Sequence, residues 1–284
     1  MSRTVTKPRV FVLGNPDKPE VRAGIEDLSA FVADRAELVG SQLGLDAGHA
    51  IRAQPDYGVV LGGDGTLISV ARDVCEAGIP LIGVNFGKLG FLTPFSVKQF
   101  RDCFDTIVTR KDLVSARTLL RVDIRRNGQR RFGGVCVNDC VIHAGPPFRL
   151  ITISIELDGR KLTTVAGDGL IVCTPTGSTA HNLSAGGPLL MSDVQSIVLT
   201  PVSAHSLTHR PVVINADGKL LIQPERINPG TTAIMDGQMQ CPLEARDRIM
   251  IRQHERRALL VQNPKRPKWY NLTTKLRWGR PPQR

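Results

Sequence analysis

The stretch VVLGGDGTLISVAR, residues 59–72, joins an apolar run to a glycine-rich turn and then to a helical pattern. It begins inside YGVVL (57–61), a continuous apolar run that predicts a buried strand of a parallel sheet. After the turn, with Thr66 as the expected N-cap, one helical face carries the apolar side chains Leu67, Val70, Ala71 and Val74. IPLIGV (79–84) then predicts the next strand. Strand, helix and strand in this order predict a three-layer α/β fold with a parallel sheet.

The rest of the chain divides by pattern into further parts. Residues 8–14 predict a strand and residues 19–45 a helix, so an α/β domain is expected over residues 1–117. Beyond it, alternating strand patterns surround three hairpin signals, which are Asn127-Gly128, Asp158-Gly159 and Asp217-Gly218. They predict a β-rich second domain over residues 118–260. Residues 261–284 form a basic C-terminal segment.

The composition is that of an ordinary globular protein. Of 284 residues, 41% are hydrophobic and 22% charged, and no apolar run reaches the ~20 residues that span a bilayer. The six cysteines form no CxxC pair, which disfavours a disulfide framework and a zinc site. We therefore expect a soluble, cytoplasmic protein with reduced thiols.

The net charge of +11 is concentrated at the C-terminus. Nine Lys and Arg residues and no acidic residue follow Glu255, which leaves residues 1–255 near neutrality. A basic tail with aromatic residues can bind single-stranded nucleic acid, be solvated, or pack on the protein. Because Trp269, Tyr270 and Trp278 lie in this tail, we favour packing and do not expect nucleic acid as a partner.

The turn Gly62-Gly63-Asp64-Gly65-Thr66 carries the first functional signal. Glycines at a strand-to-helix turn let the backbone approach a ligand and expose N–H groups to a phosphate. A carboxylate there repels an anion, unless it binds a metal or accepts a proton from an attacking hydroxyl. The alternative is a tight turn in which Asp64 only caps the helix.

Two further loops share this character. GVNFGKLGF (83–91) leaves the predicted strand 79–84 at the edge of the sheet where α/β proteins bind ligands. GDGLIVCTPTGSTAHNLSAGGP (167–188) combines glycines with many small hydroxyl side chains, which suit a sugar, a phosphate or an adenine edge.

With these motifs the chain resembles the NAD kinase family, also called polyphosphate/ATP-NAD kinases. The resemblance rests on motifs in the family's order, from about residue 10 to the C-terminus: GGDGT (62–66), NFGKLGFLT (85–93), Asn138-Asp139, DGLI (168–171), TPTGSTA (174–180), LSAGGP (183–188), HSL (205–207) with Arg210-Pro211, and Asp236-Gly237-Gln238. Lipid kinases and phosphofructokinases use loops similar to the first motif, whereas the TPTGSTA–LSAGGP block is highly specific.

The resemblance implies a fold, an activity and a set of residues. It implies a Rossmann-like first domain, a β-sandwich NAD-binding second domain with the site between them, and a C-terminal segment returning to the first domain. The implied reaction transfers the terminal phosphate of ATP, or of polyphosphate, to the 2′-hydroxyl of the adenosine ribose of NAD, giving NADP. Asp64 matches the proton acceptor, and the phosphate loop comprises Gly62, Gly63, Gly65 and Thr66. The NAD-binding positions are Asp64, Gly65, Asn138, Asp139, Arg149, Asp168, Thr179, Ala180, His181, Asn182, Leu183, Ser184 and Gln238.

The same resemblance implies a divalent cation, with Mg²⁺ arriving with ATP because the chain offers no all-protein metal cage. It also implies a homodimer or homotetramer. Because no apolar run is long enough to span a bilayer, we expect no membrane partner. His181 stands where the family usually has Tyr, and Asp139 where many relatives have Glu.

Two other interpretations of the function stay open at this point. A lipid or sugar kinase would need an acyl channel, which the hydroxyl-rich loop disfavours, and a silent NAD-binding regulator is disfavoured by the intact Asp64, Asn138 and Asp168.

Overall fold

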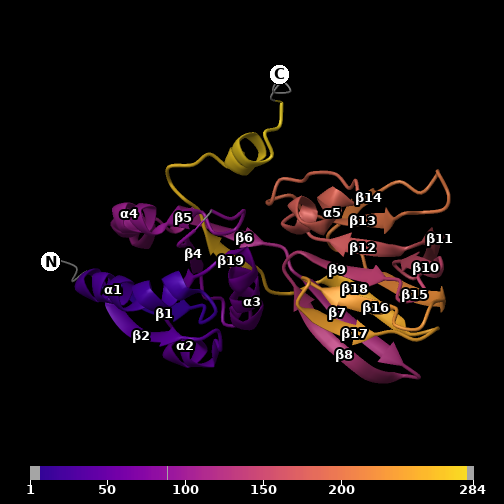
Figure 1. Cartoon of the computed structure of the whole chain (residues 1–284), viewed down its shortest axis with the longest axis horizontal. Coiled ribbons are helices and arrows are strands. Elements are labelled where there is room, and N and C mark those ends of the chain that lie inside the picture. Colours follow the sequence, from indigo (N-terminus) through magenta and orange to yellow (C-terminus); the bar gives the residue numbers. More distant parts are fainter. Residues whose placement is uncertain (1–6, 88, 280–284) are drawn as a thin grey trace. The chain divides into compact units, whose positions relative to one another are not determined.

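The computed structural model describes residues 7–87 and 89–279 (Figure 1). The chain forms two compact units, which are described separately. The first comprises the described residues up to Ala116 and again from Ala258 onward, and the second comprises Arg117–Arg257.

The first unit is built on a seven-stranded sheet in the order β2-β1-β3-β4-β19-β6, with β5 pairing β4. Its strands are β1 (Arg9–Gly14), β2 (Glu37–Leu43), β3 (Tyr57–Leu61), β4 (Leu81–Asn85), β5 (Phe95–Ser96), β6 (Val114–Arg117) and β19 (Ala258–Val261). The pairs among β2, β1, β3, β4 and β19 are parallel, as are β4 and β5. The last strand enters this sheet from the far end of the chain, with Leu260 opposite Leu81.

Helices cover both faces of this sheet. They are α1 (Pro19–Arg35), α2 (Gly48–Ala53), α3 (Asp64–Val74) and α4 (Val97–Thr109), followed by the 3₁₀ turn η1 (Lys111–Leu113). Helices α1 and α4 share one apolar cluster with Val59 and Leu61 of β3. Because side chains alternate along a strand, Val60 faces the other way, where α3 packs against β3 and β4. The predicted three-layer α/β fold is therefore confirmed.

Two local expectations for this unit were wrong. The apolar spacing over residues 19–45 looks helical throughout, but α1 ends at Arg35 and β2 follows as an edge strand. A Cβ at Gly40 of β2 would lie 2.4 Å from the Phe11 ring, so this glycine makes room for the neighbouring strand. The helix α3 begins at Asp64, and its N-cap is Gly63, three residues before the expected cap Thr66.

The second unit is a sandwich of two six-stranded antiparallel sheets in the orders β11-β10-β15-β18-β7-β8 and β14-β13-β12-β9-β16-β17. The first contains β7 (Leu120–Arg126), β8 (Gln129–Cys136), β10 (Ile151–Leu157), β11 (Arg160–Gly167), β15 (Leu220–Arg226) and β18 (Arg248–Gln253). The second contains β9 (Asp139–His143), β12 (Gly169–Cys173), β13 (Ser196–Val202), β14 (Val212–Asn215), β16 (Thr232–Met235) and β17 (Met239–Pro242). One buried apolar cluster joins the inner faces of both sheets, as predicted for a β-sandwich.

Two of the three hairpin signals mark hairpins. Asn127-Gly128 joins β7 to β8 and Asp158-Gly159 joins β10 to β11, and all four residues have positive φ angles, as a type I′ turn requires. The third expectation was wrong, because β14 and β15 lie in different sheets. Asp217-Gly218 therefore carries the chain from one layer of the sandwich to the other.

The C-terminal segment returns to the first unit, as the resemblance implied. Asn263 donates through Nδ2 to the carbonyl of Pro94 at 3.1 Å, and Arg266 donates to Oε1 of Gln99 at 3.0 Å. A single helical turn, η3 (Asn271–Lys275), follows. The expected packing by tryptophans was wrong, because Trp269 and Trp278 are 57% and 65% exposed. Polar contacts, rather than buried indole rings, hold this segment.

Candidate active site

Asp64 lies at the first position of α3, directly beyond the carboxyl end of β3. Both of its carboxylate oxygens accept hydrogen bonds from the loop that follows β4. Oδ2 accepts from the backbone N–H of Phe91 at 2.6 Å, and Oδ1 accepts from the N–H groups of Leu92 and Thr93 at 3.0 Å each. The Thr93 hydroxyl donates to Oδ1 as well, at 3.1 Å. The two glycine-rich loops singled out in the sequence therefore meet at this carboxylate.

The order of the strands in the sheet explains why these two loops lie close together. β3 and β4 are parallel neighbours, so their carboxyl ends open at the same edge of the sheet, where α/β proteins bind ligands. The approach is close, since a Cβ on Gly90 would lie 1.8 Å from Oδ1 of Asp64. No larger residue fits at position 90 without moving the loop. Gly90 also donates its N–H to the hydroxyl of Thr93 at 3.1 Å.

The phosphate-loop candidates take different positions around this point. A Cβ on Gly62 would lie 2.6 Å from the Thr66 hydroxyl oxygen, so that side chain folds back over the glycine. Thr66 is buried, and its hydroxyl accepts a hydrogen bond from Nδ2 of Asn15 at 2.8 Å. At Gly63 a Cβ would meet no atom within 4 Å, so the space beside its backbone is open. Gly63 thus borders open space, whereas Thr66 stabilises the turn.

In the second unit, Asn138 and Asp139 lie at the start of β9 and are held by another acidic residue. The carboxylate of Asp236, in the turn after β16, accepts from the backbone N–H groups of Val137, Asn138 and Asp139 at 2.9, 2.7 and 3.1 Å. Asp236 adopts a φ of 50°, the left-handed conformation that Asp tolerates better than most residues. The predicted Asn-acid pair is therefore fixed through its backbone.

Asp139 itself is 4% exposed. Burial, and second the nearby Asp236 carboxylate, raise the pKa of Asp139 to about 7. Near neutral pH this side chain exists in both protonation states, so it can donate a hydrogen bond in one and only accept in the other. A buried carboxyl group with a perturbed pKa is a frequent feature of functional sites.

The loop after β12 packs directly on this pair. The Thr174 hydroxyl donates to the carbonyl of Val137 at 2.6 Å, and the N–H of Thr174 donates to the carbonyl of Asn138 at 2.8 Å. A Cβ on Gly177 would lie 2.2 Å from that same carbonyl oxygen, so the glycine is required for the contact. The hydroxyl of Thr176 is buried without a hydrogen-bond partner among the described residues.

The remaining predicted residues of this loop divide into structural and accessible ones. Asn182 is fully buried, donating to the carbonyls of Ser178 and Pro188 and accepting from the hydroxyl of Thr200 at 2.6 Å. Its amide therefore fixes the loop and does not face a ligand in this conformation. Thr179, Ala180 and Leu183 are half-buried, and His181 and Ser184 are exposed.

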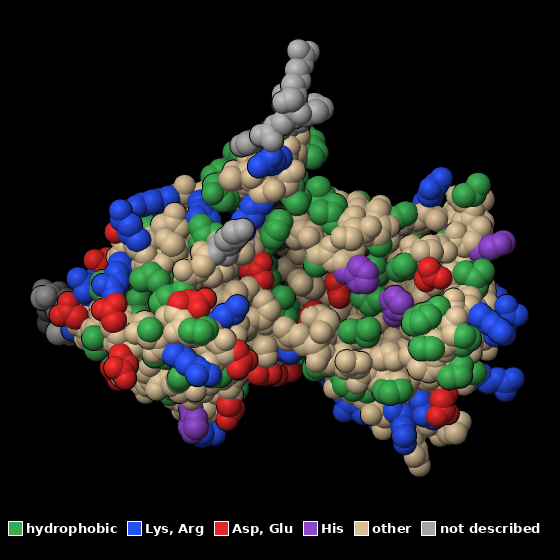
Figure 2. All heavy atoms as spheres, viewed as in Figure 1, with side chains coloured by type: hydrophobic (Ala, Val, Ile, Leu, Met, Phe, Trp, Pro, Cys, Tyr) green, Lys and Arg blue, Asp and Glu red, His purple; other side chains and the backbone are tan. Residues whose placement is uncertain are grey.

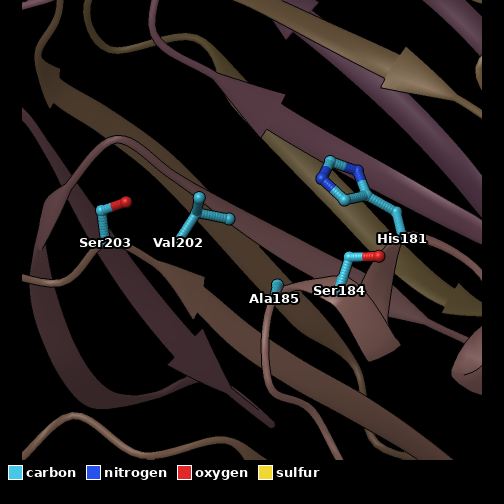
Figure 3. Close-up of a pocket in the computed structure, with 5 residues that line it drawn as sticks. All are labelled: His181, Ser184, Ala185, Val202 and Ser203. Atoms are coloured by element: carbon cyan, nitrogen blue, oxygen red, sulfur yellow. The ribbon is translucent and has the colours of Figure 1, made fainter.

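An open pocket of about 300 Å³ lies beside the short helix α5 (His181–Ser184). Figure 3 shows His181 and Ser184 of α5 on one side and Val202 and Ser203 at the end of β13 on the other, with Ala185 between them. Two of the predicted NAD-binding residues thus line a cavity with apolar and hydroxyl surfaces. Such a lining suits a ring of a nucleotide.

Three predicted residues lie elsewhere in the same unit. Gln238 is exposed in the β16–β17 turn, two residues from the Asp236 clamp. Asp168 precedes β12, and the pairing of Gly169 with His143 places it at the opposite end of β9 from Asp139. Arg149 is exposed in the loop that leaves that same end. Four residue steps of ~3.3 Å separate the two ends. The second unit therefore divides its predicted residues between both ends of one sheet, with α5 over the face between them.

The structure adds residues that sequence reasoning did not assign to the site. Thr93 and Asn15 support the Asp64 turn, and Asp236 fixes Asn138 and Asp139. The motif that contains Asp236 was recognised, but only Gln238 received a role. Asn15 follows the last residue of β1 directly, and Thr93 lies in the loop between β4 and β5, at the end of the recognised motif 85–93.

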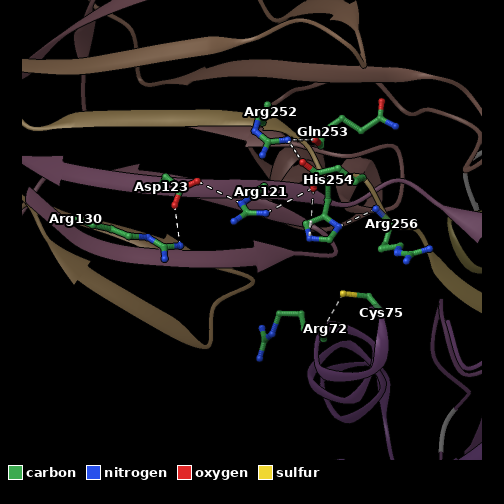
Figure 4. A network of polar contacts seen from close by, with 10 residues as sticks. Arg72, Cys75, Arg121, Asp123, Arg130, Arg252, Gln253, His254 and Arg256 are labelled. Carbon is green, nitrogen blue, oxygen red and sulfur yellow. Dashed lines mark hydrogen bonds and ion pairs between the residues drawn. The ribbon is translucent and has the colours of Figure 1, made fainter. Parts of the chain in front are cut away.

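Basic side chains in the second unit are paired in several places. In the network of Figure 4, Asp123 of β7 binds Arg130 at 2.8 Å and Arg121 at 3.5 Å. Arg252 binds Glu255, and this hydrogen bond is the main cause that lowers the pKa of Glu255 to about 2. On the face drawn in Figure 2, basic side chains are spread among acidic and apolar ones. That face presents mixed charge rather than a basic stripe.

Among the described residues, no group of three or more His, Cys, Asp or Glu side chains could hold a metal ion. No helix in the described part of the chain is long and apolar enough to cross a membrane. All six cysteines are free and buried.

Comparison with known proteins identifies the family. Residues 28–112 match the ATP-NAD kinase N-terminal domain, and residues 137–263 match the ATP-NAD kinase C-terminal domain. The chain belongs to the ATP-NAD kinase family, and it is a phosphate-transferring kinase. NAD kinase of Geotalea daltonii is 42% identical over 81% of both chains, and NAD kinase of Koribacter versatilis is 36% identical over 95% of this chain and 98% of its own.

Solved structures show the same fold at lower identity. A yeast NADH kinase complexed with NADH superposes with a TM-score of 0.83 at 20% identity, covering 99% of this chain and 90% of its own. An NAD kinase from Archaeoglobus fulgidus in complex with ATP gives 0.75 at 23% identity, covering 95% and 98%. The family fold of an α/β region followed by antiparallel sheets is therefore the fold of this chain.

Proposed function

We propose that this family member transfers the terminal phosphate of ATP, or of polyphosphate, to the 2′-hydroxyl of the adenosine ribose of NAD, and that Asp64 accepts the proton of that hydroxyl. The observation that carries the role of Asp64 is its hydrogen bonding. Oδ1 accepts three donors, whereas Oδ2 accepts one among the described residues. A carboxylate oxygen has two lone-pair directions, so Oδ2 keeps one for a substrate hydroxyl.

The chemistry follows from this arrangement. A ribose hydroxyl is a poor nucleophile at neutral pH, and a carboxylate within hydrogen-bond reach accepts its proton as the bond to phosphorus forms. The open backbone at Gly63, beside the N-terminus of α3, suits a transferring phosphate. Most of the rate enhancement would come from alignment and from positive charge on the phosphates.

The second unit supplies the NAD-binding side chains in this proposal. Asn138 and Asp139, whose backbone is fixed by Asp236, hold ribose hydroxyls. The pocket at His181 and Ser184 accepts a ring of the dinucleotide. Asp168 and Arg149 extend the binding surface to the other end of β9, as an elongated ligand such as a dinucleotide requires.

A divalent cation fits the site only together with the nucleotide. The described residues offer no three-ligand cage, and both oxygens of Asp64 already accept hydrogen bonds. Mg²⁺ commonly binds through substrate phosphates with one or two carboxylates and several waters. When bound with ATP, the cation would neutralise charge on the transferred phosphate.

Assembly and location belong to the same proposal. The second unit exposes large apolar side chains, with Phe148 66% and Leu207 84% exposed, which supports a homodimer or homotetramer. Six free cysteines support a reducing compartment such as the cytoplasm.

The test is NADP formation by the purified protein and its Asp64→Asn variant. Asparagine cannot accept the proton, so kcat should fall by on the order of 10²–10⁴-fold. The N–H₂ group of the asparagine would also face a backbone N–H donor of residues 91–93, which can disturb the loop. The affinity for NAD is therefore measured separately, and we expect it to change by less than about threefold. Asp102→Asn, an exposed carboxylate on α4, is the matched control. An Asp64→Asn enzyme with more than half of the wild-type kcat would show that Asp64 is not the proton acceptor.

A further inference from the structure

The loop that binds Asp64 is held from its other side by the C-terminal segment. Asn271 donates through Nδ2 to the carbonyl oxygen of Phe91 at 2.9 Å. Lys275 donates through Nζ to the carbonyl oxygen of Leu89, and the same ammonium lies 4.9 Å from the centroid of the Phe91 ring. Both donors come from η3, a single turn that buries none of its own residues. This turn therefore contacts the loop by directed polar groups.

Each of these two hydrogen bonds orients a peptide unit whose N–H is linked to the carboxylate of Asp64. A peptide unit is planar, so its C=O and the following N–H turn together. The carbonyl of Phe91 shares its plane with the N–H of Leu92, which donates to Oδ1 of Asp64 at 3.0 Å. A hydrogen bond from Asn271 to this carbonyl thus fixes the direction of one of the donors on the carboxylate.

The hydrogen bond from Lys275 to Leu89 reaches Asp64 indirectly, through the hydroxyl of Thr93. The carbonyl of Leu89 shares its plane with the N–H of Gly90, which donates to the hydroxyl oxygen of Thr93 at 3.1 Å. That hydroxyl donates its own proton to Oδ1 of Asp64. The Lys275 contact therefore fixes the orientation of the Thr93 hydroxyl, and through it a second donor on the same oxygen.

The charge of Lys275 is tied to the same site. Burial lowers the pKa of Lys275, the Asp64 carboxylate raises it, and the Arg266 guanidinium lowers it further. A half-buried ammonium of this kind is retained at a cost in solvation, and the carboxylate of Asp64 partly offsets that cost.

We propose that Asn271 and Lys275 are positioning residues for phosphate transfer, because they orient the 89–93 loop so that Oδ1 of Asp64 is saturated and Oδ2 is directed to the substrate hydroxyl. The C-terminal turn η3, which is far from Asp64 in the sequence, then helps to hold this carboxylate in the orientation that proton transfer requires. This inference rests on the proposed role of Asp64.

The experiment uses the full-length chain with Asn271→Leu and Lys275→Met, each removing a donor while keeping similar volume. We expect kcat for NADP formation to fall about tenfold in each, with KM for NAD and ATP within about twofold of wild type. Hydrogen–deuterium exchange of the amides of residues 91–93 should become faster, while exchange in α1 stays unchanged and shows that the unit is folded. Lys275→Arg, which keeps a cationic donor, should restore most of kcat.

Lys265→Met is the control, since Lys265 lies in the same segment with an exposed side chain. An equal fall of kcat in this control would overturn the inference. So would unchanged exchange at residues 91–93, or faster exchange with unchanged kcat. These failures are distinct from that of the proposed function, because Asp64→Asn would still be inactive in each. If Asp64→Asn is active, the role of Asp64 fails instead, and the proposed positioning role fails with it.

Discussion

The carboxylate of Asp236 accepts a hydrogen bond from the backbone N–H of Asn138 at 2.7 Å, across a sequence separation of 98 residues. The same carboxylate binds the N–H groups on either side of Asn138, so three successive peptide units converge on one side chain. Consecutive N–H groups of this kind form an anion-binding concavity. In this protein a side chain of the chain itself fills that concavity and fixes where Asn138 and Asp139 point.

Asp236→Asn should weaken NAD binding more than it slows turnover. The amide retains one acceptor oxygen and brings an N–H₂ group against backbone donors, at a cost of about 1–3 kcal/mol for the unpaired groups. We expect KM for NAD to rise about five- to tenfold, with kcat reduced less than threefold. Asp217→Asn, an exposed residue of the same unit, is the control and should behave as wild type. Equal losses in kcat and in the affinity for NAD would contradict a positioning role.

The raised pKa of Asp139 predicts a pH dependence of NAD binding. With a pKa of about 7, mainly through burial, the group is protonated in the free enzyme at pH 6 and ionised at pH 8. Ribose hydroxyls donate to a carboxylate, so bound NAD favours the ionised form. KM for NAD should therefore fall as pH rises from 6 to 8 and then level off.

Two variants check the origin of this profile. Asp139→Asn should flatten it, because the amide does not titrate. Asp236→Asn should move its midpoint to lower pH, since it removes the neighbouring charge that raises the pKa of Asp139. Identical profiles for wild type and Asp139→Asn would show that another group is responsible.

The raised pKa of Asp139 also makes the stability of the folded protein depend on pH. The pKa of Asp139 is higher in the folded than in the unfolded chain, so the folded state binds more protons between about pH 4 and 7. Its contribution to stability is therefore fully present below pH 4 and is lost as pH rises through 7. Asp139→Asn should raise Tm at pH 8 relative to wild type by more than it does at pH 5.

Gly90→Ala should inactivate the enzyme without unfolding it. The added Cβ would lie 1.8 Å from Oδ1 of Asp64 and 2.5 Å from the Thr93 hydroxyl, so the loop must move away from the carboxylate. A displacement of about 1 Å at a catalytic group costs on the order of 10²-fold in rate. Gly44→Ala, whose Cβ would meet only the Gln42 side chain at 3.9 Å, should keep full activity. Comparable kcat values for the two variants would refute the close approach.

Activity should require a divalent cation that arrives with the nucleotide. The described residues hold no metal-binding cluster, so the purified protein should contain no stoichiometric metal by elemental analysis. Excess chelator should abolish NADP formation, and added Mg²⁺ should restore it, because the charge on the transferred phosphate must be neutralised. Full activity in chelator, or one tightly bound metal per chain, would disprove this.

Sequence patterns predict those parts of the site that depend on local rules. Asp64 could be placed at the edge of a parallel sheet because a buried apolar run, a glycine turn and a helical face follow one another in the chain. Its hydrogen bonds to residues 91–93 could not, since they depend on β3 and β4 being neighbours in the sheet. The clamp of Asp236 on Asn138 is of the same kind, because it needs the pairing of β9 with β16.

The errors also have physical causes. β2 is a half-exposed edge strand that is separated from α1 by a single residue, and no Gly or Pro in the sequence marks the boundary between them. The turn at Asp217-Gly218 has the composition of a hairpin turn, but its flanking strands find partners in different sheets. Trp269 and Trp278 were expected to be buried because they are large and apolar, yet their segment is held by polar side chains.

The last prediction tests whether polar hydrogen bonds or tryptophan packing hold the C-terminal segment on the first unit. Asn263 is 3% exposed, donates to the carbonyl of Pro94 and accepts from the N–H of Lys265. Asn263→Ala removes both of these partly buried hydrogen bonds and should lower the free energy of unfolding by about 1–3 kcal/mol. The double variant Trp269→Gln, Trp278→Gln should change it by less than about 0.5 kcal/mol, because both rings are largely in solvent. Urea unfolding of the three proteins gives the comparison, and a larger loss in the tryptophan variant than in Asn263→Ala would show that indole packing holds the segment after all.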